Sequence, residues 1–214
     1  MSDQEDKKIT FKKIIVYGVI GMLIFGLPAM SYFYLKKGFE WRVNAQNELK
    51  KDFGKIPQVP ILWPDGTKEN QLQGKLCVIH SFGANPSLIP VNKFIIDTGE
   101  ELFKQFGYKK EAIRNDFRLV MIKEGGSADF DTYAETRPSA SMSNWVWTGG
   151  LNNWSKVLGE GYQYYTSTQK VSPYPNYYAL TDTSGIIRRF YNAEDKSDVE
   201  RMVQHIAILL PRQF

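Results

Sequence analysis

The sequence predicts an α/β domain behind a single N-terminal transmembrane helix, and three features lead to this fold class. Residues 14–35 form an apolar run without charge that is long enough to cross a bilayer as a helix. Residues 76–90 read as a buried strand, a loop and the start of a helix, a unit typical of α/β folds. Residues 177–210 then predict two strands joined by a turn and an amphipathic last helix.

The composition fits one anchored globular domain and excludes several functions. The chain has 214 residues, of which 43% are hydrophobic and 14% aromatic, enough for one sizeable core. Its net charge of +4 comes from 27 basic and 23 acidic residues that are spread along the chain without a basic stripe. We therefore expect no nucleic-acid partner. The single cysteine rules out an intrachain disulfide and any cysteine-only metal site.

The N-terminal segment is predicted as a polar cytoplasmic tail over residues 1–13 and a transmembrane helix in the lipid bilayer over residues 14–35. A cleaved signal peptide is the alternative, because Ala29-Met30-Ser31 loosely resembles a small-x-small cleavage site. The apolar run continues past this site through aromatic residues that suit a membrane interface, Tyr32, Phe33 and Tyr34. This continuation favours the uncleaved anchor.

Small residues line one side of the predicted span. At 3.6 residues per turn this side carries Gly18, Gly21, Gly26 and Ala29, which would let another helix approach closely. Glycine is also frequent in membrane helices in general, so the pattern has a second reading without any partner. Pro28 predicts a kink near the outer end of the helix.

A stalk or linker is predicted over residues 36–55, and the globular domain over residues 56–214. The stalk is polar with a narrow apolar stripe, and the domain begins with a strand and turn at residues 59–66. Basic residues flank the span on both sides, so charge alone does not set the orientation of the chain in the membrane.

The hydrophobic pattern places the elements that follow the first long strand. An apolar period of three to four residues predicts a helix over residues 91–106, and residues 117–122 read as a strand. The interval from Asp182 to Gly185 supplies the turn of the late hairpin. The last helix, over residues 195–210, is amphipathic and stops at Pro211.

The loop after the first long strand carries a specific pattern. Pro86 and Pro90 stand where the Sco/SenC family has the two prolines of Cys-Pro-x-x-Cys-Pro, but Asn85 and Ile89 occupy the cysteine positions. The chain resembles this family of copper chaperones for cytochrome oxidase. The resemblance implies a thioredoxin-like, Sco-like domain held outside the cytoplasm by the N-terminal helix.

Other segments resemble the same family. Residues 71–75 end in Gly-Lys ahead of the central strand, as the entry hairpin of Sco proteins does. Residues 145–150 resemble the family's apolar strand that ends in Thr-Gly before a helix, which is expected here over residues 153–158. The hairpin at residues 177–187 resembles the terminal hairpin, and residues 129–134 resemble a shortened form of a region rich in Asp, Pro and Thr.

The resemblance also implies that the copper site is lost. The family's third ligand is a histidine six residues before the leucine of the terminal hairpin, and the corresponding residue here is Tyr174. Asn85, Ile89 and Tyr174 are not the soft ligands that cuprous copper prefers. The chain also lacks the two thiols that dithiol redox chemistry needs. We therefore expect no cofactor and no catalysis.

A rebuilt site is the alternative for the remaining candidate ligands. Cys77 lies in an apolar strand, where a lone cysteine usually acts as a small buried hydrophobe. His80 could bind a metal with Cys77 or a methionine, Met121 or Met142, although a histidine on a core strand is more often a hydrogen-bonded structural residue. The dense tyrosine and tryptophan cluster over residues 145–191 fits either a protein interface or a core.

These observations lead to three hypotheses about function. The first is a noncatalytic accessory subunit or assembly factor of a respiratory membrane complex, a terminal oxidase or a quinol-oxidising partner, in the inner membrane with a periplasmic domain. The second is a copper or redox protein with a rebuilt site around Cys77 and His80. The third, an enzyme with a groove beside Asn85, has little support because no nucleophile and base pair is evident.

Overall fold

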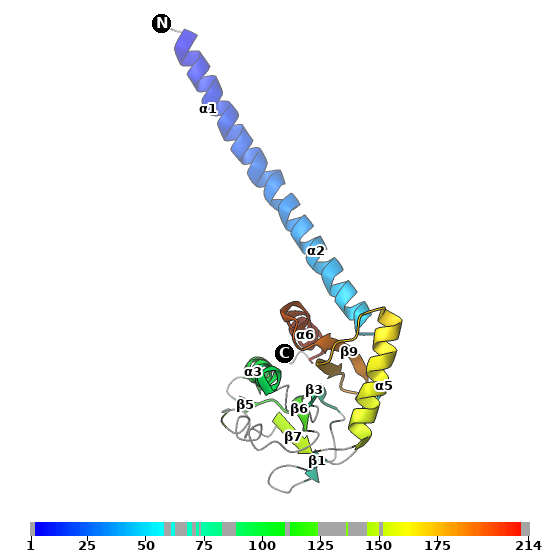
Figure 1. Cartoon of the computed structure of the whole chain (residues 1–214). Coiled ribbons are helices and arrows are strands. Elements are labelled where there is room, and N and C mark those ends of the chain that lie inside the picture. Colours follow the sequence, from blue (N-terminus) through cyan, green and yellow to red (C-terminus); the bar gives the residue numbers. More distant parts are fainter. Residues whose placement is uncertain are drawn as a thin grey trace. The chain divides into compact units, whose positions relative to one another are not determined.

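The computed structural model describes residues 3–57, 61–62, 68–69, 72, 74–82, 89–109, 112–123, 136, 145–149 and 152–210. The chain divides into two compact units, Met1–Asn47 and Glu48–Phe214 (Figure 1). Residues 48–55, which the sequence analysis assigned to the stalk, belong to the second unit.

The first unit is helical throughout its described part. It consists of α1 (Asp3–Gly21), a π-helical turn η1 (Met22–Gly26) and α2 (Leu27–Glu48), whose last residue belongs to the second unit. The stretch Lys13–Glu48 is a helix long and apolar enough to cross a membrane. Its apolar side chains are exposed along the predicted span, as a lipid-facing surface requires.

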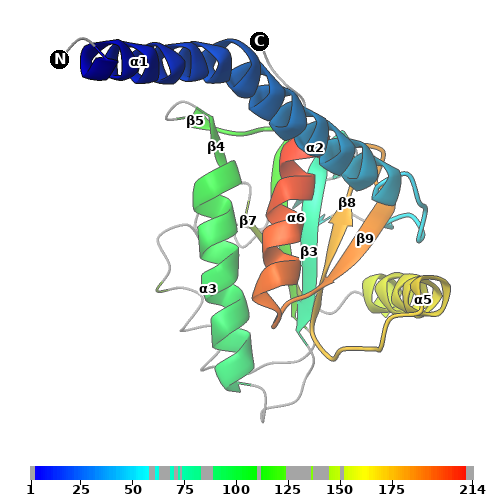
Figure 2. The ribbon, with the colours of Figure 1, turned by 90° about the horizontal axis from the view of Figure 1, so that it is seen from above.

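The predicted kink falls at the π turn rather than at Pro28 itself. Pro28 has no N–H group to donate to the preceding turn. The residue before it, Leu27, donates its N–H to the carbonyl of Met22, five residues earlier, which is the hydrogen bond of a π-helix. Figure 2 shows the helix axis changing direction between α1 and α2. A π turn is one of the recognised causes of such a bend.

The second unit is built on a five-stranded sheet in the order β7-β6-β3-β8-β9. Its parallel half contains β3 (Leu76–Phe82), β6 (Phe117–Lys123) and β7 (Trp145–Gly149). Its antiparallel half adds β8 (Tyr177–Thr181) and β9 (Ile187–Asn192), the predicted hairpin. The central strand β3 is buried on both faces, which explains why its sequence is apolar almost without interruption.

Helices cover both faces of this sheet and give it two cores (Figure 1). On one face, α3 (Ile89–Phe106) and α6 (Lys196–Leu209) bury Phe103 and Ile206 against even-numbered residues of β3 such as Val78. On the other face, α5 (Asn152–Gln169) buries Trp154 against odd-numbered residues such as Ile79. The period of two along β3 thus assigns its side chains to two separate cores.

Short elements complete the described part of the unit. Strands β1 (Ile61–Leu62) and β2 (Lys68–Glu69) form a small antiparallel pair in the region where a strand and turn were predicted. A second small pair, β4 (Tyr108–Lys109) and β5 (Ala112–Ile113), was not predicted. The predicted segment at residues 129–134 lies outside the described residues.

The late hairpin and the last helix are confirmed, and aspartate side chains fix the turn of the hairpin and the start of the helix. The Asp182 carboxylate accepts from the backbone N–H groups of Ser184 and Ile186, and Gly185 takes a positive φ of 77° that only glycine adopts easily. Asp195 is the N-cap of α6 and accepts from the N–H of Ser197.

The main difference from the sequence analysis is the length of α5, which was expected over residues 153–158 but ends at Gln169. Two glycines, Gly159 and Gly161, weaken the helical signal of this segment. In the structure Gly161 lets α5 come close to the backbone carbonyl of Phe53, where a side chain would collide. The glycine that obscures the helix in the sequence is therefore a contact point in the fold.

Candidate functional site

The connection between β3 and α3 contains two of the three positions singled out by the sequence. Asn85 lies outside the described residues, and Ile89 is the first residue of α3 with a side chain outside the described part. Both positions therefore follow the carboxyl end of β3, which runs parallel to β6. Ligand and catalytic sites of α/β sheets are concentrated at such ends.

The third position, Tyr174, lies in the segment between α5 and β8. Its backbone N–H donates to the Tyr162 hydroxyl at 2.6 Å, and that hydroxyl donates to the Tyr174 carbonyl at 2.9 Å. The two rings are 5.3 Å apart. Burial raises the pKa of the Tyr174 hydroxyl, with nearby Tyr165 adding to the rise, so it is a neutral phenol at physiological pH. A neutral phenol is a poor ligand for cuprous copper.

Most of the described aromatic cluster is core rather than interface. Tyr162 stacks on Tyr177 with ring centroids 4.1 Å apart, and Phe190 lies 5.3 Å from the Tyr177 ring. The largest fully buried side chains include four members of the cluster, Trp145, Trp154, Tyr178 and Tyr191. Tyr164 is the exception, with 55% of its surface exposed. The described aromatics of this region mainly fill the space around β8 and β9.

Cys77 and His80 lie on opposite faces of the sheet, which contradicts a rebuilt site shared between them. Cys77 belongs to the core under α5, where its thiol donates to the Lys75 carbonyl at 3.7 Å. His80, three residues along the strand, points to the other face and packs 4.4 Å from the ring of Phe82, which belongs to the core under α3 and α6. The strand itself separates the two side chains.

His80 has an unusual hydrogen-bonding state. Its Nδ1 lies 2.8 Å from the carbonyl oxygen of Tyr177, and because a carbonyl only accepts, Nδ1 carries the proton. The second nitrogen, Nε2, is then a bare lone pair, buried and without a hydrogen-bond partner among the residues that the structure describes. Burial lowers the pKa of His80 to about 4, although the bond to Tyr177 opposes the shift.

Met121 is the described methionine that the structure brings beside His80. The two residues are direct partners in the parallel pairing of β3 with β6, so their side chains emerge on the same face. The Met121 methyl group lies under α3 at Gly99, where a side chain on the glycine would come within 2.7 Å of it. Met142 lies outside the described residues. An imidazole and a thioether make two potential copper ligands, fewer than a stable metal site normally uses.

No metal-binding group of three or more His, Cys, Asp or Glu side chains occurs among the described residues. Cys77 is buried in the sheet, and His80 is flanked by aromatic rings and a methionine rather than by a nucleophile. Cys77 and His80 thus do not form a nucleophile activated by a base, the arrangement that covalent catalysis needs.

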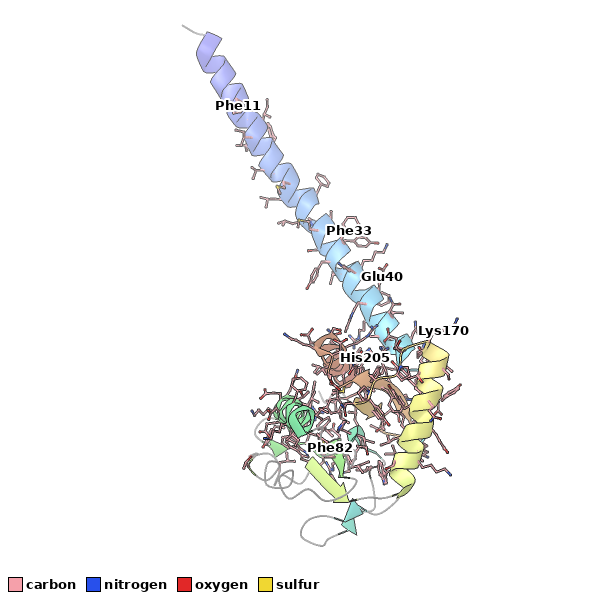
Figure 3. The ribbon with its side chains drawn as sticks, in the orientation of Figure 1. Phe11, Phe33, Glu40, Phe82, Lys170 and His205 are labelled. Atoms are coloured by element: carbon pink, nitrogen blue, oxygen red, sulfur yellow. The ribbon has the colours of Figure 1, made fainter. Side chains whose placement is uncertain are left out.

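A partly buried charged cluster that sequence reasoning missed lies where α2 ends. The Glu48 carboxylate accepts from the guanidinium groups of Arg189 on β9 and Arg201 on α6. His205 of α6 (labelled in Figure 3) is 1% exposed and places Nδ1 at 2.7 Å from the Tyr191 hydroxyl and Nε2 at 3.8 Å from Glu48. Burial and the nearby Arg189 lower the pKa of His205 to about 4.

The neighbouring Arg188 holds the same part of the chain. Its guanidinium pairs with Asp182 at 2.5 Å and also donates to the carbonyl of Lys51 at 3.1 Å. Two adjacent arginines of β9 therefore bind the chain at the end of α2, Arg189 at Glu48 and Arg188 at Lys51. The sequence gives no local signal for these contacts, because they join residues more than 130 positions apart.

Comparison with known proteins supports the fold. No family model matches the chain, and no curated protein matches it in sequence. Among solved structures, a SCO1/SenC family lipoprotein from Bacillus anthracis strain Ames is similar, with a TM-score of 0.52 and 14% sequence identity over 75% of this chain and 98% of that one. BsSco, described as a member of the Sco family of cytochrome c oxidase assembly proteins with a disulfide switch, is similar with a TM-score of 0.50 and 13% identity over 73% and 93%.

These similarities confirm the predicted fold class. The domain has the thioredoxin-like fold of Sco proteins, preceded by one N-terminal helix long and apolar enough to span a membrane. The match covers nearly the whole of each solved chain, so the likeness is not limited to a shared sheet motif.

Proposed function

We propose that this protein is a membrane-anchored, noncatalytic Sco-like protein that works through protein contacts. Its partner is a respiratory membrane complex linked to a terminal oxidase or a quinol-oxidising complex, and it acts there as an accessory subunit or assembly factor. The helix spans the inner membrane with its N-terminus in the cytoplasm and the domain in the periplasm. The proposal combines the confirmed fold with a sequence that has lost the family's ligand and thiol positions.

The single observation that carries the proposal is a thioredoxin-like domain whose only cysteine is buried in the sheet. Dithiol chemistry needs a second thiol, and a reactive thiol needs access to its substrate. Cys77 meets neither requirement, because it packs in the core under α5. A thioredoxin-like scaffold without a pair of reactive thiols is best explained by a function that uses the surface of the fold.

The transmembrane helix offers one surface for such contacts. A π turn holds one more residue than an α turn, so positions eight apart across η1 stack as positions seven apart do in a regular helix. This brings Gly26 into line with Gly18, and Ala29 into line with Gly21. A Cβ atom added to Gly18 or Gly21 would have no neighbour within 4 Å. Both glycines are therefore open to a neighbouring helix.

The test is affinity purification of the tagged full chain from membranes of its native host in mild detergent, with identification of the proteins that remain bound. We expect subunits of one respiratory complex in fixed proportion. The double variant Gly18→Leu/Gly21→Leu should reduce their recovery several-fold, because each leucine holds the partner helix away from close contact.

Leu23→Ala is the matched control in the same helix, because it removes bulk at a position outside the small-residue line. The amount of the complex that is purified with Leu23→Ala should equal the amount purified with the parent chain. If the parent chain comes out alone, and the glycine variants behave identically, the accessory-subunit proposal is wrong.

A further inference from the structure

The segment just beyond the apolar run carries a concentration of large aromatic and basic side chains. We call residues 32–42 the collar. Its five large aromatics are exposed by 46–81%, although each has a large apolar surface: Tyr32, Phe33, Tyr34, Phe39 and Trp41. Three basic residues lie among them, Lys36, Lys37 and Arg42, against one acidic residue, Glu40. So much exposed aromatic surface next to a membrane span requires a covering environment.

The aromatic side chains surround the helix instead of forming one face. At about 100° per residue, Tyr32 and Phe39 lie on one side, while Tyr34 and Trp41 lie roughly opposite. Figure 3 shows side chains standing out in different directions around the labelled Phe33 and Glu40. A protein partner covers one stripe of a helix, whereas a lipid layer surrounds it. The distribution therefore favours lipid as the occupant.

The direction of the side chains supports the same conclusion. On an α-helix each Cα–Cβ bond tilts toward the N-terminus, which for the collar is the direction of the membrane span. Trp41 lies six residues beyond Leu35, or about 9 Å along the axis at roughly 1.5 Å per residue. The tilt returns its indole ring toward the headgroup layer, where tryptophan and tyrosine are enriched.

The charge of the collar selects among lipids. Lys36 pairs with Glu40 only loosely, at 4.0 Å with both side chains more than half exposed. Such a pair is weak in water and leaves the lysine able to bind phosphate. Long basic side chains beside a span extend their charged ends to the phosphate level, and anionic lipids attract them most strongly.

We propose that the collar is a binding site for the headgroups of anionic phospholipids, and that the membrane holds the helix as far as Arg42. The aromatic rings lie in the interface on all sides of the helix, and Lys36, Lys37 and Arg42 bind lipid phosphates. The proposal depends on the chain being membrane-anchored but not on the identity of any protein partner.

The test uses the purified full chain in vesicles of phosphatidylcholine with one quarter phosphatidylglycerol. Trp41 is one of five tryptophans, so its fluorescence is obtained as the difference between the parent chain and Trp41→Phe. We expect lipids brominated near the headgroup end of the acyl chain to quench this signal at least twofold more than lipids brominated near the methyl end. Aqueous iodide should quench it little.

The second measurement is the ratio of phosphatidylglycerol to phosphatidylcholine that stays bound after extraction, read by native mass spectrometry. The parent chain should be enriched in phosphatidylglycerol over the vesicle, and Lys36→Gln/Lys37→Gln should lower the enrichment by roughly fivefold for each lysine. Lys156→Gln/Lys196→Gln removes the same charge from exposed positions on the domain and should leave the ratio unchanged.

Three results would overturn the proposal. Free access of iodide to Trp41 would place the collar in water. Protection of Trp41 from both iodide and brominated lipids would identify a protein neighbour instead. A bound-lipid ratio in the parent chain equal to that of the vesicle would remove the anionic selectivity. Each result is independent of the purification experiment, because no respiratory complex is present.

Discussion

His80 and His205 are the most unusual residues of the domain, because both are 1% exposed and both are held neutral. Each lies on the face of the sheet covered by α3 and α6, and each has its Nδ1 in a hydrogen bond, to Tyr177 and Tyr191 respectively. A neutral buried imidazole contributes to packing only while it stays unprotonated. Their burial therefore links the stability of the domain to pH.

We predict that the domain loses stability as the pH falls from about 7 toward 5. Both folded-state pKa values are about 4, below the ordinary value of 6.5, so the unfolded chain binds protons that the folded chain excludes. The stabilisation is complete above pH 6.5, and about 2 kcal/mol per histidine is lost by pH 5. Denaturant unfolding of the full chain in detergent at several pH values measures this loss.

His205→Gln is the comparison that isolates one histidine. It should reduce the pH-dependent loss by about half, because glutamine cannot take up the proton. An equal pH dependence in the parent and the variant would show that His205 contributes nothing, and the same comparison with His80→Gln would then separate His80 from the carboxylates.

At the ligand positions, we predict no high-affinity binding of cuprous copper. Tyr174 is a neutral phenol, Cys77 is separated by the sheet from His80, and the pair His80 and Met121 offers only two ligands. Titration against a competing chelator should give a dissociation constant weaker than micromolar. One equivalent bound more tightly would contradict this, and its loss in His80→Gln but not in Cys77→Ser would locate the site on the α3 side of the sheet.

Among the elements, α5 depends most clearly on a single residue. Gly161 faces the Phe53 carbonyl so closely that any side chain would displace one of the two segments. Gly159, half a turn earlier, faces open space. The same helix therefore contains one glycine required by contact and one that is not.

We predict opposite effects for the two alanine substitutions. Gly161→Ala should destabilise the domain by roughly 1–3 kcal/mol, because overpacking against a backbone atom forces a shift. Gly159→Ala should stabilise it by up to about 1 kcal/mol through helix propensity alone. Thermal unfolding of the two variants beside the parent chain tests the pair, and equal shifts of the same sign would refute the contact.

The elements also show which parts of the fold the sequence could predict. The strand at 76–82, the late hairpin and the last helix have local signals, an apolar run, an Asp-to-Gly turn and an amphipathic pattern, and all three elements are confirmed. The full length of α5 had no such signal, because Gly159 and Gly161 argue locally against a helix.

Contacts between distant segments were beyond the sequence for a physical reason. The cluster of Glu48 with Arg189 and Arg201 exists only after the sheet and α6 have formed, and isolated charges in a sequence resemble ordinary surface residues. For the candidate site, the sequence analysis named Tyr174 as a lost ligand position, and Cys77 and His80 as the alternative rebuilt site. The period of two along the predicted strand already places Cys77 and His80 on opposite faces, a signal that the sequence analysis did not use and that the two cores confirm.

For the whole molecule, we predict that the chain stays anchored with its domain outside the inner membrane. The helix Lys13–Glu48 is long and apolar enough to span the bilayer, and the orientation follows from the proposed function. Protease added to intact spheroplasts should digest the domain and leave a protected N-terminal fragment. A domain that is digested only after lysis would contradict the proposed orientation.

The Glu48 cluster has a further consequence for any cleavage that releases the domain from the membrane. A soluble fragment that starts at Lys55, the natural choice from the predicted stalk, lacks the carboxylate bound by Arg189 and Arg201. The largely buried charge of Arg189 then loses the carboxylate of Glu48 and keeps that of Asp198, 3.8 Å away. Shedding at that point would weaken the domain it sets free, whereas a cut before Glu48 would preserve it. The boundary at which the domain keeps all these contacts thus lies inside the last turn of α2.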